Sequence, residues 1–262
     1  MKTEINGIQI AFEVLGQTGY PLVLIHGFGL NRSIWKPMAS AFFGEQRTIL
    51  PDLRGHGESD APEGLYNMCL FAEDIVGLLD HLGIEKAILC GHSLGGYVAL
   101  AFAMTYPDRL AGLGMITSRS GADSEEARMG RYELAEKVRE NGSVELAKTL
   151  VPRLTTDETI RKQSSAIIEK THPTGIIGAA MGMAERPDRS HLLKEIKVPA
   201  LVVAGAEDLL IDTDQAVQMA ELLPNAELLI IPNAGHMPML ETPEALAEGL
   251  LSLAQRVSEQ RP

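Results

Sequence analysis

The amino-acid sequence predicts an α/β protein with a mostly parallel, doubly wound sheet, and three features of its 262 residues support this class. Short apolar runs of strand length alternate with longer stretches of helical periodicity along most of the chain. Apolar residues make up 45% and charged residues 22%, which is typical of a globular domain with a substantial core. A Gly-x-Ser-x-Gly segment at residues 91–95 joins one such strand to one such helix.

The elements follow one another in a regular order. Residues 3–14 read as two short strands around Asn6-Gly7, a dipeptide that favours a tight hairpin because both residues tolerate positive φ. Thr242 before Pro243 predicts an N-cap followed by proline at the first helical position. The expected strands are 22–25, 47–50, 86–90, 110–116, 200–204 and 227–231, and the expected helices between them are 33–43, 66–82, 94–105, 213–223 and 243–257.

The strand signal disappears between Thr117 and Arg186. Helical patterns take its place, and in an alternating α/β chain such an interruption is typical of a lid over the site. We therefore expect a core of residues 1–116 and 187–262 and a helical cap of residues 117–186. The expected cap helices are 124–141, 143–151, 156–170 and 174–184.

Ser93 is the candidate nucleophile. It stands at the corner between the strand and the helix, and Gly91 and Gly95 on either side lack the Cβ atoms that would keep these elements apart. The sharp turn exposes the Ser93 hydroxyl and points the start of the helix at the reacting carbonyl. The Leu94 N–H and the helix dipole can then stabilise an oxyanion.

A serine nucleophile needs a base and an acid that orients it, and the chain supplies both further along in the order Ser, Asp, His. Asp208 follows the predicted strand 200–204, and His236 follows the strand 227–231. Glu207, Asp212 and Asp214 compete with Asp208 for the role of acid. We expect Ser93, Asp208 and His236 to form a catalytic triad.

These motifs resemble the α/β-hydrolase fold family over essentially the whole chain. Further matching segments are His26-Gly-Phe-Gly29 and the run from Asp52 to Asp60. The choice of Asp208 over its acidic neighbours is what the Gly-x-x-Asp pattern of this family implies. The resemblance implies that the Phe28 N–H completes the oxyanion hole with Leu94, and that no metal or organic cofactor takes part. Within the family the chain is most similar to small bacterial carboxylesterases and the related enol-lactone hydrolases, and residues 180–188 are especially like the esterases.

Several apolar residues are candidates for the substrate pocket. Trp35 begins a helix beside the oxyanion loop, and Met237 follows His236. The cap contributes Leu134, Val138, Leu154, Ile177 and Met181. We expect structural roles for three other histidines: His26 braces the oxyanion loop, His56 sits in a loop motif, and His92 is a variable position inside the turn.

The expected function is hydrolysis of short-chain, uncharged carboxylic esters through an acyl-enzyme. Several alternatives stay open: a 3-oxoadipate enol-lactone hydrolase, a C–C bond hydrolase acting on a dienoic acid, a perhydrolase, and a non-catalytic ligand receptor or regulator of the same fold. The lactone and the dienoate carry a carboxylate, which calls for an inward arginine. Arg119, Arg128 and Arg131 are near enough in sequence to supply one.

Charge and composition restrict the partners. The formal net charge of −12 disfavours nucleic acid and anionic membranes, both of which require clustered Lys and Arg. We expect a cytoplasmic monomer or small homo-oligomer, because residues 1–6 lack the features of a signal peptide and no apolar stretch is long enough for a membrane span. Cys69 and Cys90 are expected to be free thiols, and no Cys/His cluster has zinc-ligand spacing.

Overall fold

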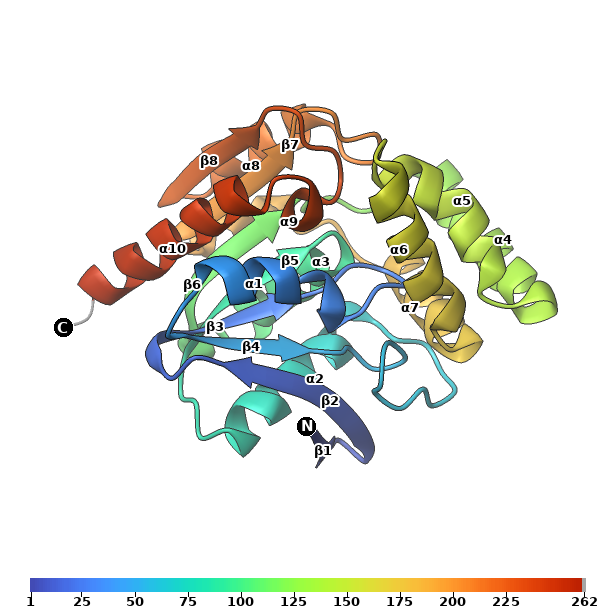
Figure 1. The fold of residues 1–262 in the computed structure, drawn as a ribbon, viewed down its shortest axis with the longest axis horizontal. Helices are drawn as coiled ribbons and strands as arrows, with labels where there is room; N and C mark the ends of the chain where they lie inside the picture. The colour runs from blue at the N-terminus through green and yellow to red at the C-terminus, as the bar shows by residue number, and fades with distance from the viewer. Residues whose placement is uncertain (261–262) are drawn as a thin grey trace.

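A computed structural model describes residues 1–260 as a twisted eight-stranded sheet with helices on both faces (Figure 1). The strand order is β1-β2-β4-β3-β5-β6-β7-β8. β1 and β2 form an antiparallel hairpin, β2 pairs antiparallel with β4, and the remaining neighbours are parallel. The strands are β1 Lys2–Ile5, β2 Ile8–Leu15, β3 Thr18–Ile25, β4 Gln46–Pro51, β5 Ala87–His92, β6 Leu110–Ile116, β7 Ala200–Gly205 and β8 Ala226–Ile231. The α/β class and the mostly parallel sheet are thus confirmed.

Helices cover both faces of this sheet. α1 packs with α10 on one face, and α2 packs with α3 on the other. The central strands β5, β6 and β7 are buried along their whole length, as expected for parallel strands covered on both sides. The helices are α1 Lys36–Phe42, α2 Met68–His81, α3 Leu94–Thr105, α4 Glu125–Asn141, α5 Val144–Leu154, α6 Glu158–Lys170, α7 Pro173–Ala184, α8 Thr213–Leu222, α9 Pro238–Glu241 and α10 Pro243–Glu259, with short 3₁₀ turns at Arg32–Ile34, Pro107–Arg109 and Ser190–Glu195.

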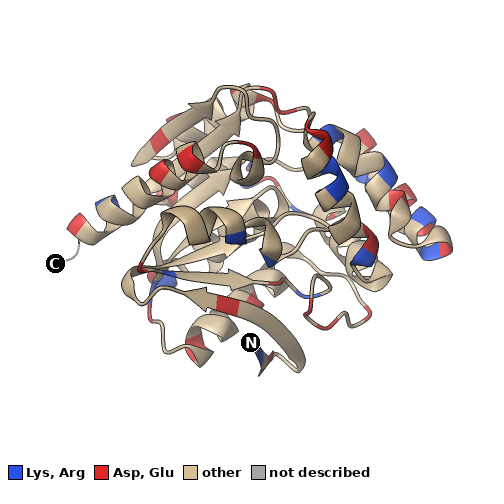
Figure 2. Cartoon of the chain, in the orientation of Figure 1, with Lys and Arg blue, Asp and Glu red and all other residues tan. Residues whose placement is uncertain are grey.

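Four of these helices, α4 to α7, lie between β6 and β7 in the chain. α4 packs mainly against α7, and α5 packs against α6. Figure 1 shows them as a separate layer, on the side toward which the arrowheads of β3 and β4 point. Many of the Lys and Arg residues lie on this layer (Figure 2). We propose that it is the cap expected for residues 117–186, standing over the end of the sheet where α/β proteins bind their ligands.

Local signals in the sequence explain most element boundaries. Asn6 and Gly7 have φ values of 51° and 76°, the left-handed conformation of a tight hairpin. The expected helix 66–82 begins at Met68, because the Asn67 side chain accepts a hydrogen bond from the Leu70 N–H and caps it. Thr242 is the N-cap residue of α10 and Pro243 follows it at the start of the helix, as expected, but the Thr242 hydroxyl makes no capping hydrogen bond and donates to the Pro238 carbonyl instead.

None of the helices within residues 1–260 has both the length and the apolar character that a membrane crossing requires.

Candidate active site

Ser93 occupies a strained turn between β5 and α3. Its φ of 51° and ψ of −113° lie outside the regions that L-residues ordinarily adopt. The neighbouring glycines are sterically required: a Cβ on Gly91 would lie 2.0 Å from the Gly95 carbonyl oxygen, and one on Gly95 would lie 2.3 Å from the Ile25 carbonyl oxygen. The two glycines therefore let the start of α3 sit directly against the sheet, with Ser93 at the corner.

Asp208 and His236 come from loops that follow the adjacent strands β7 and β8. His236 Nδ1 lies 2.8 Å from Asp208 Oδ2, and both side chains are almost fully buried. The other carboxylate oxygen, Oδ1, accepts hydrogen bonds from the amides of Leu210 and Ile211 at 2.7 and 3.1 Å. Because the carboxylate faces Nδ1, the proton belongs on Nδ1 and Nε2 is left as an acceptor, which is the tautomer a general base needs.

Ser93 and His236 line the same cavity, and no hydrogen bond joins their side chains within residues 1–260. Catalytic hydrogen bonds of this kind are often long before substrate binds.

The loop that carries His236 is held from two sides. The His236 N–H donates to the Leu154 carbonyl of α5 at 3.0 Å, which ties the loop to the cap. Glu241 Oε2 accepts from the amides of Gly235 and Met237 at 2.9 and 3.0 Å, and Glu241 Oε1 accepts from the Thr155 hydroxyl at 2.5 Å. Sequence reasoning missed Glu241, because nothing in the sequence indicates that it turns back to the residues flanking His236.

His92 does more than the sequence indicated. It is fully buried, its Nε2 lies 2.8 Å from the backbone carbonyl oxygen of His236, and the two rings are 4.9 Å apart. Burial, with the nearby His236 adding to it, holds the pKa of His92 well below its usual value. His92 is therefore neutral and donates from Nε2 to the backbone of His236, which is a structural role, as expected, and one that the sequence motif did not specify.

The loop that is expected to supply the Phe28 N–H has the bracing that was expected from His26. Its Nδ1–H donates to the Gly27 carbonyl at 2.8 Å and its Nε2 accepts from the Leu53 N–H at 3.0 Å. Burial lowers the pKa of His26 to about 4, so the ring stays neutral in this tautomer. Neither the Phe28 N–H nor the Leu94 N–H donates a hydrogen bond to any acceptor in residues 1–260, so both amides are free for a ligand.

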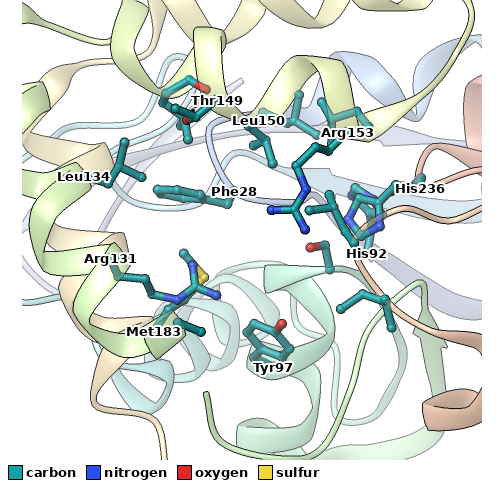
Figure 3. Close-up of a pocket in the computed structure, with 18 of the residues that line it drawn as sticks. Phe28, His92, Tyr97, Arg131, Leu134, Thr149, Leu150, Arg153, Met183 and His236 are labelled. Atoms are coloured by element: carbon teal, nitrogen blue, oxygen red, sulfur yellow. Dashed lines mark hydrogen bonds between the residues drawn. The ribbon is translucent and has the colours of Figure 1, made fainter. Parts of the chain in front are cut away.

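Ser93 lines a cavity of about 420 Å³. Figure 3 shows this cavity with the labelled side chains around it. Phe28, His92 and His236 line it together with apolar residues of the cap, among them the expected Leu134 and Leu154. Met183 of α7 also lines the cavity. Five candidates from the sequence do not line it: Trp35, Val138, Ile177, Met181 and Met237.

The buried candidates among these five pack into the protein instead. Trp35 is fully buried with its ring edge-on to His92 at 6.3 Å, and Met237 is fully buried as well. Val138 turns into the packing between the cap helices. Ile177 and Met181 lie on the same helix as Met183 but on a different side of it, so the rotation of α7 decides which of them meets the cavity.

Three arginines line the cavity, and no Asp or Glu among residues 1–260 does so. Arg119 and Arg131 were expected candidates, whereas Arg153 was not. Arg128 does not line the cavity, because it pairs with Glu125 at 3.0 Å on the surface of α4.

Arg119 and Arg131 both pair with the buried Asp123, which also binds Arg186 at 2.8 Å. Burial alone would raise the pKa of Asp123, but hydrogen bonds from Arg186 and Arg131 hold it well below its usual value. Within the same residues 1–260 no group of three or more His, Cys, Asp or Glu side chains is arranged to hold a metal ion.

The chain belongs to the α/β-hydrolase fold family, whose model matches residues 20–243. In a thermophilic esterase from Thermogutta terrifontis, solved with malate bound, the fold superimposes with a TM-score of 0.92 and 40% identity, over 98% of this chain and 97% of that one.

Two curated relatives are similar over most of the chain. The dihydrolipoyllysine-residue acetyltransferase component of the acetoin cleaving system of Pseudomonas putida is 33% identical over 97% of this chain and 69% of its own length. The 3-oxoadipate enol-lactonase 2 of Acinetobacter baylyi is 28% identical over 95% of this chain and 94% of its own length. The chain is thus a member of a hydrolase family with esterases and lactonases among its relatives.

Proposed function

We propose that the protein is a serine carboxylesterase for esters with short acyl chains. The observation that carries this proposal is the placement of Ser93 on a strained turn at the cavity, beside a buried His236–Asp208 pair. Strain of this kind is found where function requires it. The esterase and enol-lactonase relatives support the same class of reaction, since both open a carboxylic ester.

In the proposed reaction, Ser93 Oγ attacks the ester carbonyl while His236 Nε2 accepts the hydroxyl proton. Asp208 holds the imidazole in its tautomer and stabilises the imidazolium that forms. The Phe28 and Leu94 N–H groups receive the negative charge that develops on the carbonyl oxygen. His236 then returns the proton to the leaving alkoxide, and the acyl group stays on Ser93.

Water completes the cycle. It attacks the acyl-enzyme carbonyl as His236 takes its proton, and collapse of the second tetrahedral intermediate releases the carboxylic acid and restores the Ser93 hydroxyl. No step requires a group beyond the residues of the chain and one water molecule.

The size of the cavity sets the expected chain length. Each methylene buried in it contributes about 0.8 kcal/mol to transition-state binding until the space is filled. The cavity volume of about 420 Å³ suits an ester with an acyl chain of a few carbons and a small alcohol rather than a long lipid. An acyl preference of roughly two to six carbons follows.

A panel of p-nitrophenyl esters with acyl chains from acetate to laurate tests the proposal, with Ser93→Ala as the control. The kcat/KM should rise and then fall as the chain lengthens, and Ser93→Ala should lose it at every length. A value that climbs steadily to the longest chain would contradict a short-chain esterase. Binding without turnover would instead favour a receptor.

A second candidate is hydrolysis of an enol-lactone, because a lactone is an internal ester open to the same attack and an enol-lactonase is among the relatives. The arginines in the cavity favour this candidate, since such a lactone carries a carboxylate. A muconolactone-type lactone and a dienoate run beside the ester panel separate the lactonase and the C–C hydrolase from the esterase.

A further inference from the structure

The cavity that Ser93 lines differs in charge from the protein as a whole. The chain has 35 Asp and Glu against 23 Lys and Arg, yet three arginines and no Asp or Glu line the cavity within residues 1–260, together with two histidines and Tyr97. A protein with a net charge of −12 repels anions at long range. A cationic wall around its candidate nucleophile therefore indicates a ligand that brings its own negative charge.

Part of this wall is a rigid cluster that keeps an excess of positive charge. Arg119, Arg131 and Arg186 share the single carboxylate of Asp123, so two positive charges remain uncompensated. Arg186 is fixed further by hydrogen bonds to the carbonyls of Met183 and Gly121 and by stacking over the Tyr97 ring at 4.1 Å. Arg119 and Arg131 remain partly exposed toward the cavity.

Arg153 is the second source of positive charge, and it has no acid to balance it. No Asp or Glu oxygen of the described chain, residues 1–260, lies within 4.0 Å of its guanidinium. Its one hydrogen bond runs from Nη2 to the Leu209 carbonyl at 3.3 Å. Figure 3 shows the side chain reaching from α5 into the cavity, with the guanidinium between Phe28 and His236.

The position of Arg153 is coupled to the catalytic loop. The next residue, Leu154, lines the cavity and accepts the hydrogen bond from the His236 N–H at 3.0 Å. The guanidinium is therefore presented by a helix end that is fixed relative to His236, although the side chain itself is exposed. Guanidinium is planar and has several N–H donors, and it matches a carboxylate through two parallel hydrogen bonds.

We propose that Arg153 binds a free carboxylate on the substrate, and that the preferred substrates are short esters that carry such a carboxylate, such as monoesters of four-carbon dicarboxylic acids. This inference rests on the esterase function proposed above. It replaces the expectation of uncharged esters, because nothing in the sequence indicates that Arg153 faces the cavity. The excess positive charge at Arg119 and Arg131 strengthens the attraction of the substrate carboxylate to the cavity, but these two residues do not bind the carboxylate directly.

The test compares two esters of matched shape. Monoethyl succinate carries the carboxylate, and ethyl 4-methylpentanoate has an isopropyl group in its place. The enzyme should have a kcat/KM at least tenfold higher for the succinate monoester. Arg153→Met should lower that value by about 10- to 100-fold, the range expected for a hydrogen-bonded charged group, and should affect the neutral ester far less.

Arg139→Met is the matched control, because Arg139 is a second arginine of the cap that pairs with Glu136 on the surface of α4 and does not line the cavity. It should leave both substrates unchanged. Equal kcat/KM values for the two esters in the wild-type protein, or a preference that survives in Arg153→Met, would overturn the inference while leaving the esterase proposal intact.

If neither ester is hydrolysed, the esterase proposal fails and the inference is judged by binding. Succinate is then the probe, in calorimetric titrations of the wild-type protein and of Arg153→Met. The variant should bind succinate at least tenfold more weakly. Equal binding by the two proteins, or no binding by either, would overturn the inference.

Discussion

Replacing Ser93 by glycine should stabilise the protein relative to replacing it by alanine. Both changes remove the hydroxyl, but only glycine relieves the conformation at φ 51° and ψ −113°. Strained backbone of this kind destabilises the folded state by about 1–3 kcal/mol, and glycine relieves this strain. Glycine also raises the conformational entropy of the unfolded chain, which lowers the free energy of unfolding by about 0.4–1 kcal/mol. The net expectation is that Ser93→Gly exceeds Ser93→Ala by about 1 kcal/mol in the free energy of unfolding.

Urea denaturation of the two variants measures this difference, which corresponds to about 2 °C in Tm for a chain of this size. Ser252 provides the control, because it is an exposed residue within the regular helix α10. There glycine should be less stable than alanine by about 1 kcal/mol, the opposite sign. If Ser93→Gly is also the less stable of its pair, the turn is not strained and the physical reasoning for the nucleophile position fails.

Three further predictions concern the groups around Ser93. Asp208→Asn should lower kcat by on the order of 10⁴-fold, because it disturbs the tautomer of the base. Asp214→Asn, on the exposed start of α8, should change kcat only slightly. Steady-state kinetics on a short ester measures both values, and the reverse order of effects would refute the assignment of Asp208 as the acid. His26 is neutral in the fold with a pKa of about 4, so between pH 6.5 and 4 the unfolded chain binds a proton that the fold does not, and stability falls as the pH falls. At pH 5 this amounts to about 2 kcal/mol relative to pH 7, and urea unfolding should show a flatter pH dependence in His26→Gln than in the wild type. Glu241 does not line the cavity, yet Glu241→Ala should lower kcat at least tenfold, because the substitution removes the acceptor of the Gly235 and Met237 amides on either side of the base. Glu248→Ala on the surface of α10 is the control. An unchanged kcat in Glu241→Ala would show that the loop keeps its conformation without Glu241.

The sheet and the turn at Ser93 could be predicted because short-range physics determines them. A sharp turn from a strand through Ser93 into a helix brings backbone atoms so close together that Gly91 and Gly95 have no room for a Cβ. The spacing of the two glycines therefore predicts the turn. Likewise, Asp208 and His236 each follow an apolar run, and parallel strands deliver such residues to one edge of the sheet.

The lining of the cavity could not be predicted in the same way. Leu134 and Val138 lie one helical turn apart on the same face of α4, yet only Leu134 meets the cavity, because Val138 lies one turn further along the helix and is buried in the core. Arg128 and Arg153 present the same difficulty. Both are cap arginines, and only the three-dimensional arrangement shows that Arg128 pairs with Glu125 while Arg153 lines the same cavity as Ser93.

The contacts of His92 and Glu241 also lie beyond sequence reasoning. His92 reaches the backbone of a residue 144 positions away. Glu241 folds back across a short helix to the loop it supports. Neither contact follows from periodicity or from a motif, since each depends on where two loops end in space.

Intact-mass analysis after treatment with a fluorophosphonate tests most directly whether Ser93 is the nucleophile. The wild-type protein should gain the mass of one phosphonyl group as fluoride leaves. Ser93→Ala should gain no mass. Ser118→Ala is the control, because the Ser118 hydroxyl donates to the Ser93 carbonyl at 2.8 Å, and this variant should still be labelled. Labelling of a folded Ser93→Ala protein would contradict the assignment of the nucleophile and, with it, the proposed reaction.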